Sequence, residues 1–566
     1  MPENLASSVT DEADASRRQR DQIARLLEAY EQAKASGVSQ RDFAASQGIP
    51  RSSLQHWLAR QASIAAPPEA IDFFEGPVGV TWLHQIVIAA HIVMSQVGAC
   101  GVDLICQFLH LSRLSAFVGS SYGSQYEVAV AMEEHLVSYG ATETQRLGST
   151  MVNREITACL DETFHPEVCL VGIEPASNFI LVETYSERRD AESWAQSLNA
   201  ALTGLPVTIQ QVTSDAASGL LRYAQEILGV PHSPDLFHIQ RELVRATARP
   251  LAQQYCHAEK AVAQAETELA RAVAKRERYQ RRPRPGRPPS FEVTLERAEQ
   301  ALACAQQALV TAEQHQAQAQ AAIQGLSHTY HPLALDTGAW RPPAAIEAAL
   351  TAHFDTLEQI ITQAELPDYA QAKLAKAKRQ LPPMVASLHR FDQHRLTQTL
   401  TLSQLGLATL DHDFQQHLLP AVYLNKVATQ TSDTEQRHAL QVTAESLLSP
   451  LRHPDAPIQS LSSEARHHLE ALAQACVQTF QRSSSCVEGR NGQLALRHHS
   501  FHRLSPRKLQ ALTTIHNFFL TRPDGSTAAE RCFGQPPTPL FDWLLQALPL
   551  PSRPARNRPL ISRPIS

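Results

Sequence analysis

The chain has 566 residues, of which 43% are hydrophobic, 19% charged and only 6% aromatic. At about 150 residues per domain, this length predicts three or four domains with room for at least one well-buried core. Lys and Arg number 50 against 56 Asp and Glu, which gives a formal charge of −6 and a pI of about 6.5. This balance excludes a uniformly basic histone-like or ribosomal protein, so any nucleic-acid surface must be a local patch.

The cysteines and apolar segments predict where the protein resides. The nine cysteines are scattered and contain no Cys-x-x-Cys pair, which argues against a disulfide framework or a zinc ribbon and fits a reducing cytosol. The N-terminal segment lacks the apolar core of a secretory signal. The longest apolar stretch, Trp82 to Cys106, carries too many polar residues for a membrane span. We therefore expect a soluble cytoplasmic protein with no membrane association.

Residues 21–62 predict short helices with a sharp turn between the last two. Ser39 suits the N-cap of one short helix, residues 48–50 (Gly-Ile-Pro) suit the turn, and Leu54 and Trp57 of the next helix would face inward. This order is the helix-turn-helix pattern, whose second helix enters the DNA major groove. The residues expected to face DNA are Arg51, Ser52, Ser53, Gln55 and His56. An ordinary small helical bundle is the alternative.

Residues 63–80 are rich in Pro, Ala and Gly and predict a linker, while residues 81–150 predict a second helical domain. A further helix-turn-helix is conceivable over residues 101–137. A domain that only packs against its neighbour is an equally good interpretation of that segment.

Strand patterns begin near residue 151 and predict the first part of an α/β core over 151–250. Three short apolar runs joined by turns favour an antiparallel meander, and they are followed by a helix, a fourth strand, a second helix, a short segment and another helix. This order predicts a mixed five-stranded sheet in which the first and fourth strands are neighbours. The expected strands are 156–161, 168–173, 179–185 and 207–213, with helices at 187–202 and 216–228 and the short segment at 234–238.

Residues 251–330 predict an antiparallel coiled-coil hairpin. Small and medium apolar residues follow a heptad seam in two arms of about 37 Å each. A Pro- and Arg-rich tip that cannot be helical joins the arms. The tip would either bind DNA phosphates or be a solvated end, and its candidate DNA contacts are Arg281, Arg282, Arg284 and Arg287.

The rest of the chain predicts a helical insertion and the return of the core. Residues 331–474 carry helical patterns without strand signals, and 475–535 would complete the core. Residues 536–566 form a Pro/Arg-rich tail, and residues 1–20 are expected to be disordered.

Two aspartates at the ends of predicted strands form the first part of a candidate catalytic site. Asp161 ends the first strand and Asp215 follows the fourth, so neighbouring strands would bring the two carboxylates together. Paired carboxylates repel unless a cation separates them, and such hard oxygen ligands suit Mg²⁺ or Mn²⁺. The alternatives are that Glu162 replaces Asp161, that both are solvated acids, and that Asp215 merely caps the following helix.

The third carboxylate is expected from a helix that crosses the site. Glu488 is the best candidate, because it is the only acid in a basic stretch spanning 482–508. Glu464 and Glu470 are competing helical acids. Asn491, one turn beyond Glu488, would orient substrate or metal. For His238 a packing or supporting role is favoured over a role as a ligand.

Asp161, Asp215 and Glu488 resemble the Asp-Asp-Glu triad of bacterial insertion-sequence transposases, which have a ribonuclease-H-like catalytic core. The segment 234–238 (Pro-Asp-Leu-Phe-His) is similar to an Asp-x-Phe-His segment of several such families, and residues 513–533 resemble their C-terminal part. The resemblance covers the helix-turn-helix, 151–250 and about 475–535. The stretch between Asp215 and Glu488 departs from the much shorter gap of many relatives and requires an all-helical insertion.

The resemblance implies metal-dependent phosphodiester cleavage and strand transfer at the ends of a mobile element. It implies that the three carboxylates are the catalytic and metal-binding residues, holding two Mg²⁺ or Mn²⁺ ions. The implied partners are double-stranded DNA, at element ends and target, and further copies of the chain, with no small-molecule cofactor and with nucleoid association when DNA is bound. The alternatives are a catalytically silent DNA-binding derivative and a ribonuclease-H-like nuclease with another substrate.

Overall fold

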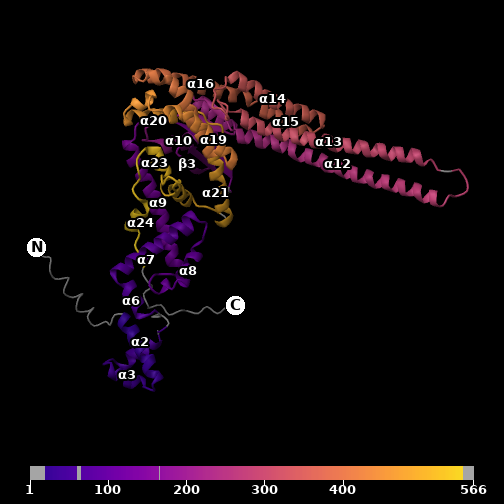
Figure 1. Cartoon of the computed structure of the whole chain (residues 1–566). Coiled ribbons are helices and arrows are strands. Elements are labelled where there is room, and N and C mark those ends of the chain that lie inside the picture. The colour runs from indigo at the N-terminus through magenta and orange to yellow at the C-terminus, as the bar shows by residue number, and fades with distance from the viewer. Residues whose placement is uncertain are drawn as a thin grey trace. The chain divides into compact units, whose positions relative to one another are not determined.

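The computed structural model describes residues 20–59, 61, 66–164, 166–287, 289–501 and 503–551 (Figure 1). These residues are mostly helical and include one five-stranded mixed sheet. Apart from Arg20, the predicted disordered N-terminus lies outside the described residues, as does the tail beyond 551. Contacts group the chain into two compact units. The first comprises Met1–Met151, Glu183–Tyr185 and Gly492–Ser566, and the second Val152–Val182 and Ser186–Asn491.

The first unit begins with the predicted helix pair. After α2 (Arg20–Ala35) come α3 (Gln40–Ser46) and α4 (Arg51–Ala59). Ser39 is confirmed as the N-cap of α3, because its side chain accepts a hydrogen bond from the Asp42 N–H. The turn places Gly48 at φ +59°, a left-handed conformation that favours glycine. Leu54 is fully buried, as predicted, and Trp57 packs against the same core.

The segment predicted as a linker at 63–80 is helical over most of its described part, so that prediction is wrong. Residues Pro68–Glu75 form α6, and α7 (Pro77–Ala90) begins directly afterwards. Each proline stands at the start of its helix, where its missing N–H and fixed φ are favourable. Ile71 of α6 is buried in the same core as Leu54. The prolines are therefore helix starts and not linker residues.

The stretch from Trp82 to Cys106, which was expected to be too polar for a membrane span, overlaps a long apolar helix. Among the described residues, Pro77–Val97 (α7 with the π-helical η1, His91–Val97) is the single helix long and apolar enough to cross a membrane, and 44% of its apolar window is buried within the fold. Its buried polar groups have partners within the unit. His91 Nε2 lies 2.8 Å from Gln125 Oε1, and Lys508 donates to Gln96 Oε1 at 2.9 Å. The polar residues of this helix therefore have partners inside the first unit, although its length and composition, contrary to the sequence expectation, are those of a membrane span.

The remaining helices of the first unit pack around the long α9. Helix α22 packs along α9, and α24 contacts both α7 and α9. Because α24 buries Leu540 and Leu544, the predicted Pro/Arg-rich tail is ordered in its first part. The helices not yet bounded are α8 (Val102–Leu111), η2 (Leu114–Ala116), α9 (Tyr122–Thr150), α22 (Pro506–Phe518), α23 (Ala528–Phe533) and α24 (Leu540–Ala547).

The sheet has the strand order β3-β2-β1-β4-β5. Strand β1 pairs antiparallel with β2 and parallel with β4, and β4 pairs parallel with β5. The first and fourth strands are therefore neighbours, as the sequence predicted. The strands are β1 (Arg154–Phe164), β2 (Val168–Glu174), β3 (Phe179–Ser186), β4 (Val207–Ser214) and β5 (His232–Pro234).

Asp161 does not end its strand, which corrects the prediction. The pairing of β1 with β4 stops at Cys159, opposite Thr213, but β1 continues along β2 as far as Phe164. The strand extends because only one of its two neighbours stops, a fact that the apolar run in the sequence does not reveal. Asp161 thus lies just beyond the edge of the parallel pairing.

Helices cover the sheet and connect its strands. Helix α10 (Ala191–Leu202) starts at Asp190, whose side chain accepts from the Ser193 N–H, and buries Trp194 and Leu198. The helix predicted at 216–228 consists of α11 (Ser218–Arg222) followed by a π-helical turn, η3 (Tyr223–Ile227).

A long antiparallel hairpin leaves the core after β5. Helices α12 (Leu236–Arg281) and α13 (Phe291–Thr329) lie side by side along their length (Figure 1). At 1.5 Å per residue, their 46 and 39 residues give arms of about 69 and 58 Å. These arms exceed the predicted 37 Å because α12 starts directly after β5 and α13 continues beyond the heptad seam.

The base of the hairpin and the following helices share one hydrophobic core, which extends from Leu236 to Phe480. The chain leaves this core through a short segment that leads into α21 (Ser485–Phe501). The helices of this insertion are α14 (Pro343–Gln363), α15 (Asp368–Lys378), α16 (Leu381–Gln404), η4 (Ala408–Leu410), α17 (Asp411–Asp413), η5 (Phe414–Leu418), α18 (Leu419–Gln430), α19 (Thr434–Leu448), η6 (Pro450–Arg452), η7 (Pro457–Ser460) and α20 (Ser463–Gln478).

Candidate active site

Asp161 is a buried carboxylate at the centre of the site. Its residue is only 7% exposed, its Oδ1 accepts the Glu162 N–H at 2.8 Å, and its Oδ2 accepts from Asn491 Nδ2 at 3.0 Å. Burial, together with the smaller effect of the negative charges of Glu488, Asp215 and Asp235, raises the pKa of Asp161 from 3.8 to about 7. Asp161 therefore holds its proton more tightly than an exposed aspartate does.

Glu162, the alternative to Asp161, belongs to the other face of the sheet. Successive side chains of a strand point in opposite directions. The Glu162 carboxylate meets Trp194 Nε1 at 3.4 Å and Arg189 at 3.4 Å, both on the side of α10. The structure therefore selects Asp161 as the carboxylate that faces Glu488.

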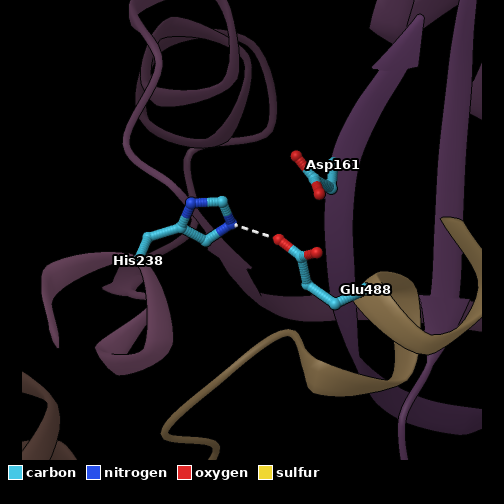
Figure 2. A group of neighbouring side chains, drawn as sticks. All are labelled: Asp161, His238 and Glu488. Atoms are coloured by element: carbon cyan, nitrogen blue, oxygen red, sulfur yellow. Dashed lines mark ion pairs between the residues drawn. The ribbon is translucent and has the colours of Figure 1, made fainter. Parts of the chain in front are cut away.

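Glu488 reaches the site from the first turn of α21 (Figure 2). One of its carboxylate oxygens lies within 4.8 Å of an Asp161 carboxylate oxygen and of His238. The competing acids, Glu464 and Glu470, are exposed on α20 and belong to no such group among the described residues. Of the three helical acids, Glu488 is the one that the fold brings to Asp161.

His238, near the start of α12, faces both carboxylates (Figure 2). Its Nε2 lies 2.9 Å from Glu488 Oε1 but outside hydrogen-bond geometry. Its Nδ1 accepts a hydrogen bond from the Arg241 guanidinium at 2.8 Å. Since arginine can only donate, Nδ1 must be unprotonated and a neutral ring carries its proton on Nε2. In that tautomer Nε2–H points its proton toward the acidic group, so His238 lies close to Glu488 as a neighbouring donor, while its atoms also have ligand-like spacing.

Arg241 was not anticipated from the sequence. It lies one helical turn after His238, 3.5 Å from Glu488 Oε1, and its charge partly balances the carboxylates. The spacing of His238 and Arg241 on a predicted helix was the signal available to find it.

Asp215 is exposed and follows β4 directly. Cys159 of β1 pairs with Thr213 of β4. Asp161 lies two residues after Cys159, and Asp215 lies two residues after Thr213. The two aspartates therefore follow the last parallel pair by the same number of residues. Its Oδ1 accepts the Ala217 N–H at 2.9 Å, so Asp215 also performs the helix-capping role that was the alternative. The next residue, Ala216, has φ +61°, which is strained for a residue with a side chain. This conformation fixes the direction in which the chain leaves β4.

Asp235 joins the two helices that carry His238 and Glu488. It is 1% exposed and is the N-cap of α12, with its Oδ1 accepting the Phe237 N–H at 2.7 Å. Its Oδ2 accepts from the Ser484 N–H at 3.1 Å and from the Ser484 hydroxyl, immediately before α21. One carboxylate therefore sets the starting points of α12 and α21. An Asp before a helix signals a cap, but the partnership with Ser484, 249 residues away, could not be inferred.

Two carboxylates, Asp161 and Glu488, meet closely enough to share a divalent cation, while Asp215 follows the neighbouring strand. The oxygen ligands are those that Mg²⁺ and Mn²⁺ prefer. The pKa of Asp161 is raised chiefly by burial, with a smaller contribution from the neighbouring carboxylates. Asn491 Oδ1 is buried without a hydrogen-bond partner in the described part of the chain, although its Nδ2 holds Asp161. Asn491 could therefore accept from a metal-bound water. Among the ligands assigned from the sequence, Asp215 is absent from the compact group, whose third member is His238.

The residues assigned to DNA contact are all described, and most are solvent-accessible. On α4, Ser53 is half-buried and the others are exposed; the exposed ones are Arg51, Ser52, Gln55 and His56. At the hairpin tip all four arginines are exposed, and these are Arg281, Arg282, Arg284 and Arg287. DNA contact by either surface stays a prediction.

Comparison with known protein families matches the C-terminal part of the chain. Residues 414–560 match a family described as "Family of unknown function (DUF6399)". The matched segment begins in the helical insertion and includes Glu488 and the helices after it. No curated protein matches the chain significantly.

Proposed function

We propose that the chain is a DDE-type transposase with a ribonuclease-H-like core, which cleaves phosphodiester bonds at the ends of an insertion sequence and joins them to target DNA with Mg²⁺ or Mn²⁺. The observation that carries the proposal is that two carboxylates from distant parts of the chain meet, Asp161 on β1 and Glu488 at the start of α21. Asp215, which follows the neighbouring strand β4, is the proposed third member. The mixed five-stranded sheet with its helices is compatible with such a core.

The protein's own groups divide the work at this site. Asp161, Asp215 and Glu488 would hold the cation, which when bound would activate a water or a DNA 3′-hydroxyl and stabilise the leaving oxygen. Asn491 fixes Asp161 through its amide. His238 and Arg241 hold the carboxylate of Glu488 from the opposite side. No protein nucleophile is needed.

Helix-turn-helix and hairpin surfaces would deliver the DNA. The exposed face of α4 and the arginines of the tip are the two candidate contacts. They would bind DNA phosphates or bases independently of the carboxylates, so binding and cleavage are separable. Self-association, double-stranded DNA as partner and nucleoid association in a bacterial cytoplasm belong to the same proposal.

The test uses the full-length protein, Mg²⁺ and a duplex that carries the inverted repeats flanking the coding region. Asp161→Asn, Asp215→Asn and Glu488→Gln should each abolish end cleavage and leave DNA binding intact. Glu464→Gln and Glu470→Gln are matched controls that should cleave normally. Near-normal cleavage by any of the three site variants would remove that residue from the catalytic set.

Other outcomes identify the alternatives. DNA binding without cleavage of any substrate would indicate a catalytically silent DNA-binding derivative. Cleavage of RNA or of branched junctions in preference to element ends would indicate a ribonuclease-H-like nuclease.

A further inference from the structure

A pocket of about 110 Å³ opens beside the carboxylates, in the angle between α12 and α15, and has room for several water molecules. Its walls combine the end of β4 and β5 with the two helices. The charged and titratable residues among its lining are Asp215, Asp235, His238, Arg241, Glu242 and Lys376. The pocket therefore joins the catalytic aspartate to the helical insertion, to which Lys376 belongs.

All three acids in the pocket have hydrogen-bond or ion-pair partners. Glu242 is paired with Lys373 at 2.7 Å and with Arg245 at 3.2 Å. Asp235 accepts hydrogen bonds from the starts of α12 and α21. Asp215 accepts the Ala217 N–H and is the exposed acid of the pocket.

Two cations also line the pocket. Arg241 uses one part of its guanidinium on His238 and Glu488, while its buried Nε has no hydrogen-bond partner among the described residues. Lys376 is exposed and forms no ion pair within the part of the chain that the structure describes. The unused donors of these two side chains suit an anion as the ligand of the pocket.

The three lysines of helix α15 differ in their ion pairs, and Lys376 is the one without a partner among the described residues. Three of the chain's eight lysines lie on this helix. Lys373 is paired with Glu242, and Lys378 is paired with Asp355 and Glu358, both at 2.9 Å. Only Lys376 lines the pocket. The helix therefore neutralises its neighbouring acids with two lysines and leaves the third for an external anion.

We propose that this pocket is a phosphate subsite in which Lys376 and Arg241 bind a backbone phosphate of the nucleic acid next to the scissile bond. The inference rests on the proposed function for the identity of the ligand. It gives the helical insertion a direct part in substrate binding, because Lys376 belongs to the inserted helix α15 and not to the sheet that carries Asp215. A lysine acts there as a charged donor to a phosphodiester oxygen.

Lysine acetylation footprinting of the full-length protein tests the subsite. The modification of each lysine is measured by mass spectrometry in EDTA, with and without an arbitrary-sequence DNA duplex. DNA should lower the acetylation rate of Lys376 severalfold and leave the rates of Lys373 and Lys378 unchanged. Unchanged acetylation of Lys376 under conditions where the duplex is fully bound would overturn the proposal. Protection by inorganic phosphate but not by DNA would overturn it as well, because the ligand would then be a small anion.

Salt titration of DNA affinity provides the second measurement. Removing one phosphate contact should reduce the slope of log K against log[salt] by about 0.9. We expect this change for Lys376→Ala, restoration of the slope by Lys376→Arg, and no change for Lys378→Ala, which removes a lysine already paired. Equal slopes for all four proteins would contradict the subsite.

The two proposals can fail separately. Both measurements are made without a divalent cation and need no cleavage. Protection of Lys376 in a protein that never cleaves DNA would refute the proposed function and leave a nucleic-acid phosphate site. Cleavage at element ends without protection of Lys376 would refute the phosphate subsite and leave the proposed function.

Discussion

Replacing Asp161 with Asn should stabilise the metal-free protein at neutral pH. In the folded protein the pKa of this carboxyl is raised from 3.8 to about 7, chiefly by burial. The rise corresponds to about 4 kcal/mol of unfolding free energy. Asn is nearly isosteric with Asp and carries no charge, so it removes this penalty. Its amide can also meet Asn491, whose Oδ1 has no partner among the described residues and can accept after the Asn491 amide turns over.

The sign of the effect follows from proton binding. Between pH 3.8 and about 7 the folded protein keeps a proton on Asp161 that the unfolded chain releases. The contribution of Asp161 to stability is therefore fully present below pH 3.8 and is lost as the pH rises to about 7. In EDTA, the titration of other groups should change the unfolding free energy of the Asp161→Asn protein and of the wild type equally. The difference in unfolding free energy between the two proteins should therefore grow by about 4 kcal/mol across this pH window.

Amide hydrogen exchange in β1 and β2 is the suitable assay, because it reports the opening free energy of the sheet itself rather than of the whole two-unit chain. Exchange is compared at several pH values after correction for the intrinsic rate. Adding Mg²⁺ or Mn²⁺ at pH 8 should slow exchange in the wild type, by about 2.7 kcal/mol at 100 times the Kd, and not in Asp161→Asn. Glu464→Gln should behave as the wild type throughout. A difference between Asp161→Asn and wild type that stays constant from pH 4 to 8 would refute the reasoning.

Other groups give three further predictions. Asp235→Ala should lower the unfolding free energy by about 2–4 kcal/mol in urea titrations, because it uncaps α12 and leaves the Ser484 N–H unpaired. Ser484→Ala should lower the unfolding free energy by about 1 kcal/mol. Equal losses for the two variants would show that the shared cap is unimportant. Replacing the four arginines of the hairpin tip with Ala should reduce the salt slope of DNA affinity by up to about 3.6, and an unchanged slope would mark the tip as a solvated end. Burial lowers the pKa of His232 from 6.5 to about 4, so the wild type should lose about 3 kcal/mol as the pH falls through this range while His232→Gln should not, as acid unfolding curves would reveal.

The sheet was largely predictable because its signals are local. Alternating or continuous apolar runs, separated by turns, located the strands to within a few residues, and the strand order placed the ends of the first and fourth strands together. The end of β1 was misplaced because strand length depends on pairing with β2, which no local pattern records. Proline misled in the opposite way, since Pro68 and Pro77 begin helices where composition alone favoured a linker.

The candidate site was predictable in its acids and not in its cations. Asp161 and Asp215 were marked by their positions after apolar runs, and Glu488 by its isolation in a basic stretch. Arg241 and Lys376 lie in helices full of other charged residues, so only the tertiary structure distinguishes them from solvated side chains. The assignment of His238 likewise depended on a contact, because the hydrogen bond from Arg241 determines which ring nitrogen carries the proton.

The long gap before Glu488 is the main departure from the transposases that the sequence resembles, and the geometry explains why it need not disturb the candidate site. The insertion leaves the core at Leu236 and returns at Arg482, and the Leu236 N–H donates to the Arg482 carbonyl at 3.0 Å. Asp235 binds the residues on both sides of this contact. The two ends are therefore fixed to each other, and Glu488 occupies its position whatever number of helices lies between them. Because the entropy of closing a loop grows only with the logarithm of its length, a larger insertion adds little cost once its ends are bound and its own core is formed. The insertion can then supply Lys376 to the pocket without any change in the carboxylates.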